Sequence, residues 1–119
     1  MEVHRRLDLT LMRFNILDEI AAMKSSAQWN STGRGAKTLV KNDELRIVLV
    51  ALSAGKAIHE HHAEGAISVS VVEGAIRFTG DGKEQGLRSG SLLALAAALP
   101  HGVEALEDSA FMLTVVIQP

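Results

Sequence analysis

The sequence predicts an all-β protein in which a barrel or sandwich of short strands follows a short N-terminal strand and a short helix. Short apolar runs recur from Lys37 onward, with turn residues between them about every eight to twelve positions. Residues 67–71 alternate between apolar and polar side chains, which is typical of a strand with one buried face. Asp81-Gly82 joins two further runs, and this dipeptide favours the tight turn of a β-hairpin.

The length and composition indicate one globular domain. The chain has 119 residues, of which 47% are hydrophobic and 22% charged, and these values are ordinary for a soluble domain. Disordered, collagen-like and coiled-coil classes do not fit this composition. A chain of this size buries roughly two thirds of its unfolded surface, so it can build its own core.

Charge and cysteine content exclude several kinds of site. The net charge is −2, without the basic excess that proteins use to bind nucleic-acid phosphates, so we expect no nucleic-acid partner. There is no cysteine, which excludes disulfides, cysteine-ligated metals and thiol nucleophiles. The longest apolar stretch, residues 92–100, is too short to span a bilayer, so we expect no membrane partner and a cytoplasmic location.

The N-terminal third is expected to be mixed in structure. Residues 15–24 predict a short helix, because Asn15 can cap its first turn and apolar side chains recur at helical spacing. Residues 25–36 are polar and contain glycine, which predicts a loop. We therefore assign residues 1–36 to an N-terminal strand, helix and loop, and residues 37–119 to the barrel of the same domain.

The barrel is expected to contain eight short strands. Each is an apolar or alternating run that ends near glycine or another turn residue. The predicted strands are residues 38–40, 45–52, 67–71, 75–79, 84–88, 92–95, 103–106 and 111–117.

Histidines provide the clearest candidate site. Three of the five histidines fall within residues 59–62, and His101 lies far downstream. On an extended segment residues two apart share a face, so His59 and His61 could present two imidazoles together. First-row metals accept imidazole nitrogens. The alternative is that these histidines are exposed polar residues of a loop.

Two stretches resemble the signatures of the cupin superfamily. The segment from Gly55 to Gly74 resembles the first signature, a glycine, a His-x-His pair, a glutamate and a second glycine at fixed spacing. The segment from Gly90 to His101 resembles the second, which ends on a histidine. The resemblance covers about residues 37–117. It implies a small single-domain cupin of the RmlC-like, "cupin 2" type, with a jelly-roll β-barrel.

The first signature departs from the family pattern. Counted from Gly55, the two histidine positions fall on His61 and Ala63, and the glutamate position falls on Ile67. In this register one histidine and the carboxylate are lost. An alternative register keeps His59 and His61 as the pair, but its spacing on both sides is wrong.

The second signature keeps its histidine but has alanine at its proline, glycine and asparagine positions. Ala96 and Ala98 stand where the family has proline and glycine, and Ala105 stands at the terminal asparagine position. His101 falls at the family's own spacing from Gly90.

The resemblance therefore implies a candidate metal site with an altered ligand set. The expected ligands are His59, His61 and His101, with His62 as a possible substitute, and the expected metal is Fe, Mn, Ni, Zn or Cu. Ile67 shares the phase of Val69 on the apolar face, so both are expected to line the barrel pocket beside the histidines.

Two classes of function remain open. In the first, the protein is a small cupin that binds a divalent metal and a small, partly apolar ligand. If it is an enzyme, the resemblance implies an oxygenase, an isomerase or a related metal-assisted reaction. In the second, it is a metal-free cupin that binds or senses a ligand without catalysis. The alanines and Ile67 at signature positions favour the second class, and the histidines favour the first.

The N-terminal strand bears on assembly. Leu7, Leu9 and Leu11 alternate with polar residues, and such a strand needs a sheet edge and an apolar surface to be stable. Small cupins similar to this chain commonly form dimers, often by exchange of terminal strands. We expect a homodimer with these leucines at or near the interface, although an arm folded onto its own barrel is the alternative.

Overall fold

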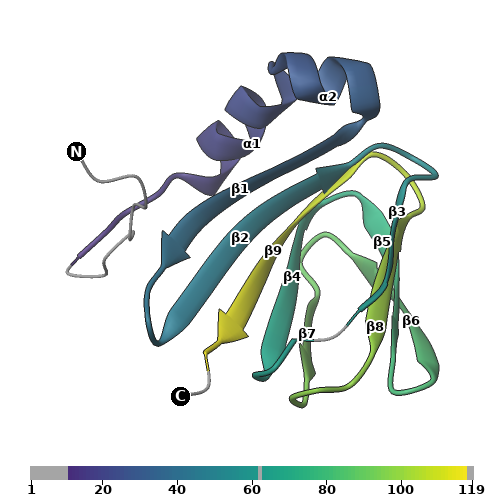
Figure 1. Cartoon of the computed structure of the whole chain (residues 1–119). Helices are drawn as coiled ribbons and strands as arrows, with labels where there is room; N and C mark the ends of the chain where they lie inside the picture. The colour runs from purple at the N-terminus through teal and green to yellow at the C-terminus, as the bar shows by residue number, and fades with distance from the viewer. Residues whose placement is uncertain (1–10, 62, 118–119) are drawn as a thin grey trace.

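Two antiparallel β-sheets pack face to face, and two short helices lie against the larger sheet (Figure 1). The computed structural model describes residues 11–61 and 63–117. The helices are α1 (Ile16–Lys24) and α2 (Ala27–Thr32). The strands are β1 (Arg34–Lys41), β2 (Leu45–Leu52), β3 (Ala57–His61), β4 (Ile67–Glu73), β5 (Ala75–Gly80), β6 (Lys83–Arg88), β7 (Leu92–Leu95), β8 (His101–Ala105) and β9 (Ser109–Val116).

The chain alternates between the two sheets, as in a jelly roll. The larger sheet has the order β1-β2-β9-β4-β7, and the smaller has the order β3-β8-β5-β6. From β3 onward each strand lies in the other sheet from the one before it, except within the β5–β6 hairpin. The predicted all-β jelly-roll fold with a short N-terminal helix is confirmed.

The main core lies between the sheets. Its side chains come from alternate positions of the facing strands, so the alternation in residues 67–71 does mark one buried face. The buried members are Val50, Leu52, Ile67, Val69, Val71, Ile76, Phe78, Val103, Ala105 and Phe111.

A second core lies between the helices and the outer face of the larger sheet. Ile20 and Met23 of α1 pack there with Leu49 and Ala51 of β2. Because the opposite face of β2 contributes to the main core, residues 49–52 are buried on both sides. This explains why that stretch is continuously apolar rather than alternating.

The predicted loop over residues 25–36 is wrong. Ser26 caps helix α2, its side-chain oxygen accepting a hydrogen bond from the Trp29 N–H at 3.2 Å. Gly33 ends the helix in the left-handed region at φ 70°, and β1 begins at the next residue. Ser26 and Gly33 were the helix signals, but six residues are too few to show a helical period.

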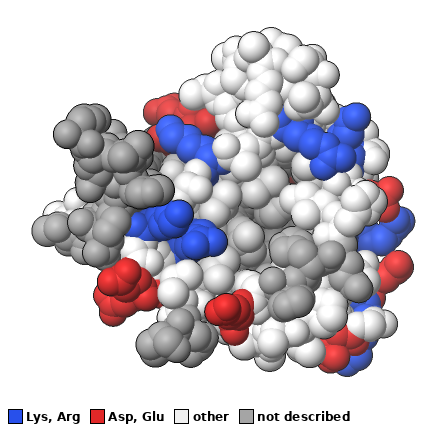
Figure 2. Space-filling model, viewed as in Figure 1, with Lys and Arg blue, Asp and Glu red and all other residues white. Residues whose placement is uncertain are grey.

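The predicted N-terminal strand begins before the described residues. Leu7 and Leu9 of the predicted N-terminal strand lie outside the described residues. No helix among the described residues is long and apolar enough to cross a membrane. On the face shown in Figure 2, basic and acidic side chains are interspersed, in keeping with a net charge of −2.

Candidate functional site

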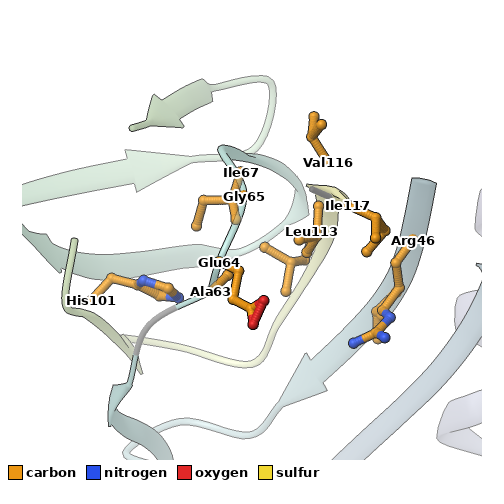
Figure 3. Close-up of a pocket in the computed structure, with 11 residues that line it drawn as sticks. Arg46, Ala63, Glu64, Gly65, Ile67, His101, Leu113, Val116 and Ile117 are labelled. Carbon is orange, nitrogen blue, oxygen red and sulfur yellow. The ribbon is translucent and has the colours of Figure 1, made fainter. Parts of the chain in front are cut away.

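A pocket of about 470 Å³ opens at one end of the sandwich, between β2, β9, the start of β4 and the β3–β4 connection (Figure 3). Residues from both sheets line it, so the fold itself forms the pocket. The lining residues are Arg46, Val48, Ala63, Glu64, Gly65, Ile67, His101, Leu113, Val115, Val116 and Ile117.

Most of the lining residues are aliphatic, and the polar side chains among them are Arg46, Glu64 and His101. Ile67 is buried and lines the pocket together with His101, as Figure 3 shows. Val69, two residues further along β4, is buried in the main core and is not among the lining residues. The pocket therefore favours a ligand with an apolar body, because binding would remove aliphatic surface from water.

His101 is the buried polar group of this pocket. Its side chain is 4% exposed, and its ring stacks on Phe78 with centroids 5.9 Å apart and planes 10° apart. The ring Nδ1 lies 3.2 Å from the carbonyl oxygen of Leu99. A carbonyl oxygen only accepts, so Nδ1 is the donor in this contact. A backbone carbonyl orients metal-ligating histidines in the same way.

A turn with an uncommon backbone conformation precedes His101. Ala98 has a φ of 66°, in the left-handed region that favours glycine. Its N–H donates to the carbonyl oxygen of Ala63 at 3.0 Å, which ties the β7–β8 turn to the β3–β4 connection. This tie joins the segment leading to His101 to the wall of the pocket that contains Ala63.

His61 and His101 occupy facing backbone positions. Strands β3 and β8 are antiparallel, and the register places His61 directly opposite His101. The register shifts between Ile58 and His61, so one irregularity lies inside the histidine cluster. His62 lies outside the described residues.

His59 lies elsewhere. Its side chain is exposed and borders a separate groove on the outer face of the smaller sheet, beside Arg77 and Glu104. That groove contains an ion pair, with Arg77 Nη1 2.6 Å from Glu104 Oε1. His59 and His101 therefore line different cavities. The prediction that His59 and His61 share a face assumed a regular strand, whereas the register of β3 shifts between Ile58 and His61.

Two charged residues, Arg46 and Glu64, stand at the pocket and point toward it from different elements (Figure 3). Both are exposed, so they belong to its rim. Arg46 was missed at the sequence level, although a signal was present. It shares the phase of Val48 and Val50 on β2, which places a charge in a row of core-facing positions.

The described residues offer few donors to a metal. In the pocket they supply the imidazole of His101 and the carboxylate of Glu64, while Ala63 and Ile67 occupy ligand positions of the family pattern without a donor atom. No group of three potential ligands forms within residues 11–61 and 63–117 whose side chains are described. By themselves these residues do not fit a transition-metal site, and a site there would need His61.

Comparison with known proteins identifies the fold. The sequence matches no protein-family model and no curated protein. A conserved protein of unknown function from Streptococcus pyogenes has a similar structure, with a TM-score of 0.77 and 20% identity over 99% of both chains. An RmlC-like cupin from Shewanella frigidimarina gives a TM-score of 0.68 at 22% identity, covering 72% of this chain and 78% of that chain.

A larger enzyme contains a similar barrel. Salicylate 1,2-dioxygenase from Pseudoaminobacter salicylatoxidans, in a structure with gentisate, gives a TM-score of 0.76 at 16% identity. The match covers 86% of this chain but only 32% of the enzyme chain. At these identities the likeness concerns the fold alone.

Proposed function

We propose that this chain, which has the fold of RmlC-like cupins over most of its length, binds a small, partly apolar organic molecule in the pocket of its barrel. The observation that carries the proposal is a pocket of about 470 Å³ with aliphatic walls and one buried imidazole. Ligand sites in proteins commonly combine mostly apolar walls with a few polar groups that fix orientation.

The signature substitutions support this use of the pocket. Ala63 and Ile67 stand where the family pattern has a histidine and a glutamate, and both line the pocket. They replace two polar ligands with aliphatic surface. His101 remains as an oriented hydrogen-bonding group, because Leu99 and Phe78 hold its ring.

A pocket-filling variant tests the proposal with benzamide as a neutral probe. Benzamide should shift the amide resonances of pocket residues in an NMR titration of the wild-type protein. Ala63→Phe should abolish these shifts, because the added ring fills the space that the probe needs. Ala94→Phe, on an exposed position of β7, is the matched control and should leave binding unchanged. No shift in the wild-type protein, or equal binding to the filled variant, would overturn the proposal.

Metal binding is a second candidate function, favoured by the register of His61 and His101. A cation held by these two residues, with His59 or His62 as the third ligand, would keep the ligand set implied by the cupin resemblance. Fe, Mn, Ni, Zn or Cu would supply Lewis-acid chemistry when bound, and the resemblance then implies an oxygenase or isomerase type of reaction. The likeness to a dioxygenase supports this reaction class through the fold alone.

Calorimetric titration of tag-free protein with Mn²⁺ and Zn²⁺ tests the second candidate. His101→Ala should abolish binding if the pocket holds the metal. His59→Ala is an informative companion, because its side chain borders the outer groove rather than the pocket. Retention of metal by His101→Ala would reject the site, and loss in His59→Ala would restore His59 as a ligand.

We further propose that the protein is a cytoplasmic homodimer. The support comes from the alternating leucines of the N-terminal segment and from Leu11, which is 90% exposed at the start of the described chain. An aliphatic side chain so exposed gains stability when another surface covers it.

A further inference from the structure

Arg46 occupies a position that the fold otherwise reserves for apolar side chains. On β2 it is in phase with Val48, Val50 and Leu52, all of which face the inside of the sandwich. It lies at the end of this row, where the pocket opens and water can reach the guanidinium. Because the guanidinium stays hydrated, its charge costs little at this position and remains accessible to an anionic group of a ligand.

A second cation stands beside it. The antiparallel register of β1 and β2 places Lys41 directly opposite Arg46. Like charges at directly opposed positions of a sheet destabilise the pair of strands. A bound anion would offset this repulsion. The two acidic residues of the β1–β2 turn, Asp43 and Glu44, do not line the pocket, so they place no carboxylate in it beside Arg46.

On the other side of the pocket, the carboxylate of Glu64 disfavours a negatively charged group of the ligand. Glu64 comes from the β3–β4 connection, and in Figure 3 its carboxylate and the Arg46 guanidinium approach the pocket from different sides. A ligand with one negative end near Arg46 can meet this arrangement. A second negative charge at the opposite end would face Glu64 and be repelled.

We propose that the pocket selects a small monocarboxylate with an apolar body, whose carboxylate pairs with Arg46 while its body packs against Val48, Leu113 and Ile67. This inference rests on the proposed ligand-binding function and names the chemical class of its ligand. Arginine suits the role because its planar guanidinium can donate two parallel hydrogen bonds to one carboxylate. Lys41, opposite Arg46 in the sheet, adds positive potential near the guanidinium.

Three matched probes test the selectivity by titration calorimetry. Benzoate carries one negative charge, benzamide is its neutral analogue, and terephthalate has a second carboxylate at the far end. The wild-type protein should bind benzoate about tenfold more tightly than benzamide, and terephthalate more weakly than benzoate. The preference for benzoate should fall as NaCl is raised, because the rim is exposed to solvent.

Variants that remove one charge test whether Arg46 binds the carboxylate of the probe and whether Glu64 repels a second carboxylate. Arg46→Gln should bring benzoate to the affinity of benzamide and leave benzamide unchanged. Glu64→Gln should improve terephthalate selectively. Arg88→Gln, on exposed edge strand β6, is the matched control and should behave as wild type.

The outcomes separate this inference from the function on which it rests. If benzamide and benzoate bind equally well to the wild-type protein, the ligand class is wrong and the pocket proposal stands. If the benzoate preference survives in Arg46→Gln, the assignment to Arg46 is wrong. If no probe binds, the ligand-binding function itself fails.

Discussion

Ala98 is held in a backbone conformation that its side chain disfavours. Its φ of 66° places it in the left-handed region, where a Cβ costs roughly 1–2 kcal/mol. The cupin signature has glycine at this position, and the turn keeps the conformation that glycine suits. The hydrogen bond from Ala98 N–H to Ala63 O is one interaction that holds the turn in place.

Ala98→Gly should therefore stabilise the protein. Relief of the left-handed strain outweighs the extra freedom of glycine in the unfolded chain, so we expect the free energy of unfolding to rise by about 0.5–1 kcal/mol. Urea denaturation measures it. Ala96→Gly is the control, because Ala96 has no positive φ and glycine there should only destabilise. A loss of stability in both variants would contradict this explanation.

Ile67 offers a second test at the scale of one residue. It is 4% exposed and lines the pocket with His101, at the position where the cupin signature has its glutamate. Ile67→Glu should strengthen Mn²⁺ binding about tenfold or more, because it adds a carboxylate ligand to the imidazole. Calorimetry of the folded variant measures the change.

The control for Ile67→Glu is Val72→Glu on the same strand. Val72 packs against the second core rather than the pocket, so a carboxylate there adds charge without a ligand in the site. Metal binding by Ile67→Glu no tighter than by the wild-type protein would count against a surviving cupin site.

At the scale of elements, Ser109 joins the start of β9 to the start of β5. Its side chain is fully buried, and its oxygen lies 2.9 Å from Ala75 O and 2.7 Å from Glu107 O. The same oxygen accepts a hydrogen bond from Ala75 N–H at 3.0 Å. One hydroxyl thus links a strand of the smaller sheet to a strand of the larger sheet.

Ser109→Ala should lower the free energy of unfolding by about 1–3 kcal/mol, because Ala75 N–H would lose its buried acceptor. Thermal and urea denaturation measure the loss. Ser70→Ala, on the outer face of β4, should change stability by no more than about 0.5 kcal/mol. Equal effects at the two serines would show that the buried link contributes little.

The elements were predictable from sequence where the local signal matched the tertiary environment. The hairpin is the clearest case, since Asp81 and Gly82 both have positive φ, as the Asp-Gly turn predicts. Helix α1 begins after Asn15, whose side chain accepts from Asp18 N–H at 3.0 Å. Helix α2 was missed because its six residues are too few to show a helical period between the caps at Ser26 and Gly33.

The candidate site was less predictable than the fold. The spacing from Gly90 identified His101, and the phase of β4 identified Ile67 as buried. The position of His59 depends on a register shift in β3, which a two-residue alternation cannot reveal. Arg46 came into the site through strand pairing, because β2 reaches the pocket only by lying beside β9.

At the scale of the whole molecule, the uncovered leucines point to assembly. Leu11 and Leu17 are 90% and 64% exposed near the N-terminal end of the described chain, and Leu92 on edge strand β7 is 71% exposed. Exposed aliphatic side chains at a sheet edge favour contact with another surface.

Removal of the N-terminal arm tests the homodimer. The full chain should sediment as a dimer, and a variant that begins at Met12 should sediment as a monomer, since it lacks Leu7, Leu9 and Leu11. A variant with Asp at these three leucines keeps the length and should also be monomeric. A monomeric full chain, or a dimer that survives both changes, would reject the proposed interface.

Because β2 is buried on both faces at residues 49–52 only, its two ends should differ in how readily they open locally. Leu49 and Ala51 are shielded by helix α1 on one face and by strand β9 at their edge, whereas Arg46 and Val48 border the pocket. Amide protons of residues 49–52 should exchange with deuterium only on global unfolding, and those of residues 46–48 by smaller local openings. The end of β2 at the pocket would then open locally and admit a ligand, while residues 49–52 stay folded.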